Sequence, residues 1–240
     1  MYKKLRGPMK PELRWAQMKK QLAKVKSAKR KQAVYSDIDL WMMGSFLENR
    51  LELPLLEMWE ALQERLHLPE IVFHPGNKPL YKRSLYAPTE KCPWRGKVMQ
   101  GEVHDENTWA LAGVAPHAGL FGDIRSVSSW GLQLREAWLG ENELFGDEKM
   151  VHHFCGRRIS RTVGDWGLGF MKPSRPRASC GKYFSVQSFG HTGFTGTSLW
   201  FDPKQDLLVV ILSNRVYPTR ENKAFLELRP QIHNWVVEAL

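Results

Sequence analysis

Apolar residues recur every three or four positions along the first seventy residues, which is the spacing of amphipathic helices. The first such stripe consists of Trp15, Met18, Leu22 and Val25. Further helices are predicted over about 37–50 and, with a proline suited to its first turn, 54–66. Residues 74–102 show no periodicity and are rich in Pro, Gly and Asn, so they are predicted to be irregular.

The period changes in the last third of the chain. After a short predicted helix over about 126–139, strands are predicted over 183–189, 197–201 and 207–212, the last two joined by a turn at 202–206. A closing helix is predicted to be interrupted at Pro230. Helices followed by strands and a last helix indicate an α+β fold with an antiparallel sheet.

The charge is concentrated at the N-terminus. The net charge is +10, yet residues 1–33 alone hold twelve basic side chains and one acidic side chain, so the remainder is nearly balanced. We therefore predict a basic amphipathic arm over 1–33 and a single domain over 34–240. The stripe of the arm either packs on the domain with its lysines in water, or lies on nucleic acid or an anionic membrane.

Metal and cofactor chemistry find little support in the composition. The three cysteines, Cys92, Cys155 and Cys180, form no C-x-x-C pair, so we expect buried thiols. The histidines in 104–106 and 152–153 lack the spacing of metal ligands, and His117 is interpreted as a structural hydrogen-bonding residue. We predict neither a metal nor a cofactor.

Two short clusters carry candidate chemistry. Tyr35-Ser36-Asp37 precedes a predicted helix, and Gly190-His-Thr-Gly-Phe-Thr-Gly196 leads into a predicted strand. Taken alone, the first is an N-cap and the second a glycine turn.

The order of these clusters among other motifs changes that interpretation. Between them lie Gly101-Glu-Val-His-Asp-Glu-Asn107, Gly113-Val-Ala-Pro-His-Ala-Gly-Leu-Phe121 and Trp166-Gly-Leu-Gly-Phe170, and Ser213-Asn-Arg-Val-Tyr-Pro-Thr219 and Arg229-Pro-Gln-Ile-His233 follow. From about Trp15 to Leu240 the chain resembles the serine β-lactamase-like hydrolases, which include class C β-lactamases, penicillin-binding proteins and related esterases. The resemblance implies a β-lactamase/transpeptidase-like fold: an antiparallel sheet flanked by helices, here incomplete, beside a mostly helical lobe, with the active site between them.

The resemblance also implies roles for individual residues. Tyr35 matches the tyrosine of the family's Tyr-x-Asn element, which moves a proton between nucleophile and leaving group, and Asp37 stands where Asn is commoner. His191, Thr192 and Gly193 match the Lys/His-Thr-Gly element. There the histidine supplies positive or hydrogen-bonding character and the threonine contacts substrate. The backbone N–H of Phe194 is the implied oxyanion donor.

The family's nucleophile motif, Ser-x-x-Lys, is not found upstream of Tyr35. The pattern occurs once, at Ser179-Cys-Gly-Lys182, where Gly181 and nearby prolines predict a loop rather than the helix that the chemistry needs. The chain is therefore expected to match the C-terminal two-thirds of the family's domain, as a truncated and weakly active or inactive copy. A separate chain that supplies the missing part is one expected partner.

Three functions remain open at this point. The first is acyl-transfer hydrolysis of a β-lactam, a D-Ala peptide or an ester; the second is a non-catalytic module that binds ligands or a partner. The third is an adaptor that binds nucleic acid or an anionic membrane through its basic arm. No run approaches the ~18 apolar residues of a membrane span and no signal peptide is evident, so the expected location is cytoplasmic, or periplasmic if a further segment precedes residue 1.

Overall fold

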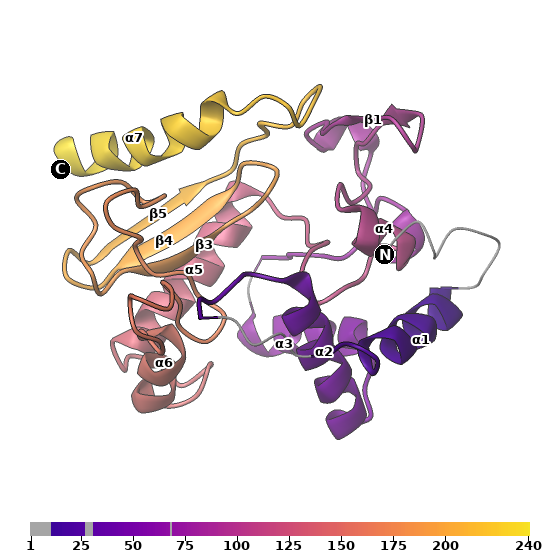
Figure 1. Cartoon of the computed structure of the whole chain (residues 1–240), viewed down its shortest axis with the longest axis horizontal. Coiled ribbons are helices and arrows are strands. Elements are labelled where there is room, and N and C mark those ends of the chain that lie inside the picture. The colour runs from indigo at the N-terminus through magenta and orange to yellow at the C-terminus, as the bar shows by residue number, and fades with distance from the viewer. Residues whose placement is uncertain (1–10, 27–30, 68) are drawn as a thin grey trace. The chain divides into compact units, whose positions relative to one another are not determined.

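A computed structural model describes residues 11–26, 31–67 and 69–240 (Figure 1). The chain divides into two compact units, an N-terminal unit (residues 1–30 and 34–122) and a C-terminal unit (residues 31–33 and 123–240). The helices are α1 (Pro11–Leu22), α2 (Asp37–Leu51), α3 (Leu55–Leu66), α4 (Glu106–Ala110), α5 (Ile124–Trp138), α6 (Glu148–Cys155) and α7 (Ala224–Glu238). The strands are β1 (Lys91–Cys92), β2 (Lys97–Val98), β3 (Phe189–Thr192), β4 (Ser198–Asp202) and β5 (Leu207–Ile211).

Helix α1 is part of the core of the N-terminal unit. Met18 and Leu22 are buried in one cluster with Trp41 of α2 and with residues of the α4 region. Val25 lies beyond the end of the helix and is exposed. Of the two alternatives for the stripe, packing on the protein is the one that the structure shows for Met18 and Leu22. Their apolar surface is not available to a membrane in this arrangement.

One carboxylate links three helices. Glu48 of α2 accepts hydrogen bonds from Trp15 Nε1 and, at 3.4 Å, from Lys19 Nζ, both on α1. Its other oxygen accepts from the backbone N–H of Leu55 at 3.1 Å, where α3 begins. An otherwise unsatisfied donor at a helix N-terminus is thereby paired.

The segment between α3 and α4 is irregular, as predicted, apart from two short 3-10 turns and the β1–β2 hairpin, which was not predicted. Polar side chains hold it together. His74 is fully buried, pairs through Nδ1 with Gly101 O at 2.7 Å, and stacks on Phe121 with ring centroids 4.1 Å apart. Arg95 donates to the carbonyls of Val103 and His104. Buried backbone groups without regular secondary structure thus find partners.

The C-terminal unit is built on an antiparallel sheet of order β3-β4-β5. Figure 1 shows α7 along one face and α5 with α6 against the other. Residues of β4 alternate accordingly: Trp200 packs in the cluster that includes Val236 of α7, and Phe201 in the cluster that includes Leu134 of α5. This is the predicted α+β architecture.

Two predicted elements need correction. Residues 183–188 form turns rather than a strand, because Ser185 bonds through both its N–H and its hydroxyl to Asp202; the strand begins at Phe189. Helix α7 runs through Pro230 without interruption, since the loss of one backbone bond is outweighed by packing of its buried face. In addition, helices α4 and α6 were not predicted.

Among the described residues, no helix combines the length and the hydropathy required to cross a membrane.

Candidate functional site

Tyr35, Ser36 and Asp37 lie at the N-terminus of α2. Ser36 has an extended backbone (φ −149°), and its Oγ accepts from the N–H of Ile38 at 3.2 Å, so it is the N-cap. Asp37 is the first residue of the helix, where its negative charge is favoured by the helix dipole. Tyr35 precedes the cap and is half-exposed.

Asp37 is one of three titratable side chains that converge in the N-terminal unit. The imidazole of His117 is buried, and its Nε2 lies 3.0 Å from Asp105 Oδ1 and 3.9 Å from Asp37 Oδ2. The other ring nitrogen, Nδ1, accepts a hydrogen bond of 2.8 Å from the indole N–H of Trp41. We call Tyr35, Asp37, Asp105 and His117 the Tyr35 cluster.

The electrostatics of the Tyr35 cluster oppose ionisation of the phenol. Burial first, and then the charges of Asp37 and Asp105, raise the pKa of Tyr35 above its ordinary value. The pKa of Asp37 is also raised, chiefly by burial. Burial alone would raise the pKa of Asp105, but hydrogen bonds from His117 and Thr108 outweigh it and lower this pKa to about 2. Tyr35 is therefore a neutral hydrogen-bond donor at neutral pH.

Asp37, Asp105 and His117 could together hold a metal ion, because one ligand atom of each lies within 4.8 Å of the others. Among the described residues this is the only group with such geometry. Trp41 can only donate, so Nδ1 of His117 must be the acceptor and the ring proton sits on Nε2. That proton occupies the lone pair that a metal would need. We assign no metal to the cluster.

The second predicted motif closes strand β3 in the C-terminal unit. We call residues 190–197 the His191 loop. His191 and Thr192 pair with Leu199 and Ser198 of β4, and the N–H of Gly193 donates to Thr197 O at 2.8 Å. A Cβ on Gly190 would lie 2.1 Å from Leu199 O, so this strand requires a glycine where it meets β4.

His191 is held as a neutral ring. Its Nδ1 lies 3.0 Å from the Thr192 carbonyl, and its ring centroid lies 5.9 Å from that of Trp166 in the Trp-Gly-Leu-Gly-Phe motif. Burial outweighs the backbone hydrogen bond and lowers the pKa of His191. Of the two properties that the family resemblance implied for this residue, hydrogen bonding is therefore favoured over positive charge near neutral pH.

Positive charge near the His191 loop comes instead from arginines. The guanidinium carbons of Arg215 and Arg220 lie 4.6 and 5.7 Å from the centroid of the Phe194 ring, which is exposed. Arg215 N–H donates to Thr195 O at 2.8 Å and so ties the segment after β5 to the loop.

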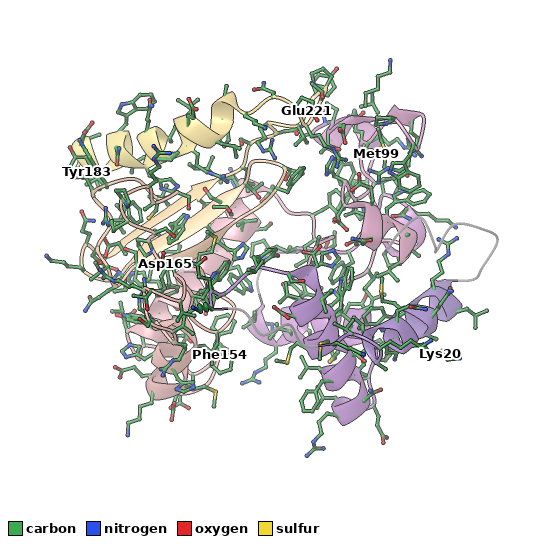
Figure 2. The ribbon with its side chains drawn as sticks, in the orientation of Figure 1. Lys20, Met99, Phe154, Asp165, Tyr183 and Glu221 are labelled. Atoms are coloured by element: carbon green, nitrogen blue, oxygen red, sulfur yellow. The ribbon has the colours of Figure 1, made fainter. Side chains whose placement is uncertain are left out.

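Sequence reasoning missed Lys172, which supports the motif on the other side of β3. Its buried ammonium donates to Cys155 O and Gln187 O, and burial lowers its pKa to about 8. Its backbone N–H donates to the carbonyl of Asp165, which is labelled in Figure 2 and whose side chain accepts from Arg157 at 2.8 Å. No spacing pattern distinguishes such a lysine from a surface lysine.

The Ser-x-x-Lys pattern at Ser179 is a turn, as predicted. The Ser179 hydroxyl oxygen is buried without a hydrogen-bond partner, and the Lys182 ammonium lies 4.6 Å from the centroid of the Tyr183 ring. The two side chains are not arranged as a nucleophile and its base. Of the predicted site residues, Tyr35 and Asp37 lie in the N-terminal unit, and His191, Thr192, Gly193 and Phe194 lie in the C-terminal unit.

Comparison with known proteins matches these motifs to one family. The family model described as "Beta-lactamase" matches residues 2–230. A "Putative D-alanyl-D-alanine carboxypeptidase" of Salmonella gallinarum is 30% identical over 233 residues, covering 88% of this chain and 53% of that protein. A protein of the same description from Salmonella agona is 29% identical and is covered to 52%. The chain thus spans about half the length of these curated relatives.

Solved structures agree on the fold. A β-lactamase of Mycobacterium bovis superposes with a TM-score of 0.60 and 16% identity, covering 87% of this chain and 65% of that one. EstCE1, described as a hydrolase with promiscuous acyltransferase activity, gives a TM-score of 0.56 and 15% identity, with coverages of 85% and 57%. With the family model matching most of its length, the chain belongs to the serine β-lactamase-like family.

Proposed function

We propose that this chain carries the proton-transfer and substrate-contact residues of a serine β-lactamase-related hydrolase, whose substrate is a β-lactam, a D-Ala peptide or an ester. Tyr35 would move the proton, with His191 as a neutral hydrogen-bonding group. Thr192 and Asp37 would contact the polar groups of the acyl substrate, and the backbone of Gly193–Phe194 would face the oxyanion. Family membership and the order of the motifs support these assignments.

We further propose that the chain by itself turns over acyl substrates slowly or not at all. The observation that carries this is the state of Ser179: its Ser-x-x-Lys pattern lies in a turn, with the lysine on an aromatic ring. An acyl-transfer site needs a nucleophile whose proton can be removed. A partner chain that supplies a Ser-x-x-Lys helix would complete the set.

The test is covalent labelling. The purified chain is incubated with a fluorophosphonate and, separately, with a penicillin, and its intact mass is measured before peptide mapping. We expect no stoichiometric adduct with the wild type, and none with the Ser179→Ala variant. A stoichiometric adduct that maps to Ser179 or Ser36 would overturn the proposal of slow turnover and define a rearranged active site.

A second function, non-catalytic binding of acyl or peptide ligands, is favoured by one observation. The pKa of Tyr35 is raised and that of His191 is lowered, so both groups are uncharged hydrogen-bonding groups at neutral pH. Binding of penicillin without an adduct, measured by calorimetry and weakened in Thr192→Val, would support it. Equal affinity of the wild type and Thr192→Val for penicillin would contradict this second function.

A further inference from the structure

A continuous chain of hydrogen bonds leads from the core of the N-terminal unit to the Tyr35 cluster. The Trp41 indole donates to His117 Nδ1 at 2.8 Å, and the opposite ring nitrogen lies 3.0 Å from Asp105 Oδ1. Because an indole N–H is only a donor, the tautomer of His117 is determined: Nδ1 accepts and Nε2–H donates to the carboxylate.

Each residue of this hydrogen-bond chain is held in place by further contacts. Gly44 allows α2 to approach the 113–118 segment, since a Cβ there would lie 2.7 Å from Pro116 Cγ. That approach places Trp41 against His117, with the two rings edge to face at 5.2 Å. Asp105 is the N-cap of α4 and accepts from Thr108 N–H at 2.7 Å, so its carboxylate cannot turn away. His117 is therefore held between the buried indole of Trp41 and the carboxylate of Asp105, which caps α4.

We propose that Asp105 and His117 are positioning residues for Tyr35 and Asp37. His117 Nε2–H holds the Asp105 carboxylate toward the start of α2 and, at 3.9 Å from Asp37 Oδ2, presents its remaining positive dipole to the second carboxylate. The titratable groups that act on the phenol within this unit are then Asp37 and Asp105, with His117 between them. The inference rests on the proposed function only where it gives Tyr35 a role in acyl transfer.

The arrangement has a chemical consequence for the proposed reaction. Burial first, and then the two carboxylates, raise the pKa of Tyr35 above its ordinary value, so the phenol oxygen keeps its proton in the resting state. Tyr35 then begins as a donor, and loses its proton only when a cation is brought to it. The hydrogen bonds that hold Asp105 contribute to this retention, after burial and the charge of Asp37, because they fix where the Asp105 charge lies.

The first test measures the titration of Tyr35 in the full chain. Ultraviolet difference titration, with Tyr35→Phe as the reference that removes the other tyrosines from the signal, gives the phenol pKa. Asp105→Asn keeps an N-cap side chain for α4 but removes the charge. We expect it to lower the pKa of Tyr35 by about half a unit or more. The matched control is Asp123→Asn, which changes the N-cap of α5 in the C-terminal unit and should leave the titration unchanged.

The second test reads the tautomer of His117 at neutral pH, and so does not depend on stability in base. Long-range ¹H–¹⁵N correlation spectra should show the Nε2–H form alone in the wild type. Trp41→Phe retains the aromatic ring but removes the donor, and a mixture of tautomers is expected. A merely structural indole would leave the tautomer unchanged.

Any of three results would overturn the proposal. The first two are an unaltered Tyr35 titration in Asp105→Asn and an Nδ1–H tautomer in the wild type. The third is binding of Zn²⁺ that shifts the Nε2 resonance, because the metal would replace the proton. None of these measurements needs turnover, so they fail or succeed independently of the covalent-labelling test of the proposed function.

Discussion

His233 of α7 has no exposed surface, and its ring meets Phe184 edge to face at 5.3 Å. Burial, and secondarily the charge of Arg229, lowers its pKa to about 4. In an unfolded chain the same imidazole titrates near pH 6.5. Between these two values the unfolded state binds a proton that the folded state does not.

The buried His233 therefore makes the folded state less stable at low pH. Stability should fall as the pH is lowered from about 6.5 to about 4, by about 3 kcal/mol in total. His233→Gln removes the titrating group, so its free energy of unfolding should change less across this range. Urea unfolding of both proteins at pH 7, 5.5 and 4.5 measures this. Parallel losses in the two proteins would show that the imidazole is protonated while folded.

Asp105 makes the stability of the protein depend on pH in a lower range. Its pKa of about 2 lies below the ordinary value of 3.8, so the stability it contributes is present above pH 4 and is lost as the pH falls toward 2. The difference corresponds to about 2 kcal/mol. Asp105→Asn should lack this loss, which acid titration of stability would detect as a shallower slope below pH 4. A variant with the wild-type slope would contradict this assignment.

At the scale of elements, glycines mark where strands approach most closely. Gly190 of β3 faces the backbone of β4, and an added Cβ would lie 2.1 Å from Leu199 O and 2.8 Å from Trp200 Cα. A backbone cannot move aside as a side chain can, so we expect Gly190→Ala to cost at least about 3 kcal/mol. Gly96→Ala is the control: its φ is +70° but no atom lies within 4 Å, and it should cost about 1 kcal/mol. Thermal melts of equal midpoint would show that β3 shifts to admit the methyl.

Helix α1 offers a second test at this scale. Met18 has no exposed surface, whereas Leu13 on the same helix is 56% exposed. Met18→Ala should destabilise the protein by about 2–5 kcal/mol and Leu13→Ala by less than 1 kcal/mol. Denaturant unfolding of the two variants compares them directly. Equal small losses would mean that α1 detaches from the unit at little cost.

The sequence predicted best those elements whose pattern is local. Helices α2 and α3 have strong periodicity, and each of their ends was predicted to within about a residue or two. A strand was wrongly predicted over 183–188 because Phe184 is buried between polar neighbours, which resembles the alternation of a strand. In the structure a turn bonded to Asp202 places Phe184 against His233 of α7. The true strand, Phe189–Thr192, holds glycine and histidine and exists through its pairing with β4 and Met171.

The candidate site divides in the same way. Tyr35, Asp37 and the His-Thr-Gly residues follow from ordered motifs, because those residues are adjacent in sequence. The Asp105–His117 pair is separated by twelve residues and joins the N-cap of α4 to the segment that follows this helix, so spacing could not connect it to Tyr35. The upward direction of the Tyr35 pKa also depends on charges that only the fold brings near.

On the scale of the whole molecule, each unit holds its own hydrophobic core. Met18, Leu22 and Trp41 belong to a cluster in the N-terminal unit, while Phe189 and Trp200 belong to two separate clusters in the C-terminal unit. A cavity at Met18 should therefore loosen one unit more than the other.

Hydrogen exchange followed by mass spectrometry tests this. In Met18→Ala, peptides from α1, α2 and α4 should exchange faster, while peptides from β3–β5 should retain most of their protection. His233→Phe, a change in the C-terminal unit, serves as the reciprocal control. Uniform acceleration along the chain in both variants would show one cooperative core instead of two.

Glu48 has a consequence for how this protein can change over evolutionary time. A single carboxylate satisfies two side-chain donors on α1 and a backbone N–H at the start of α3, so substitutions at Trp15 and Lys19 are coupled to the residue at position 48. A variant that loses Glu48 removes the acceptor of all three donors at once. Helices α1 and α2 are thus constrained to change together at these positions, and a double-mutant cycle between positions 15 and 48 would measure that epistasis directly.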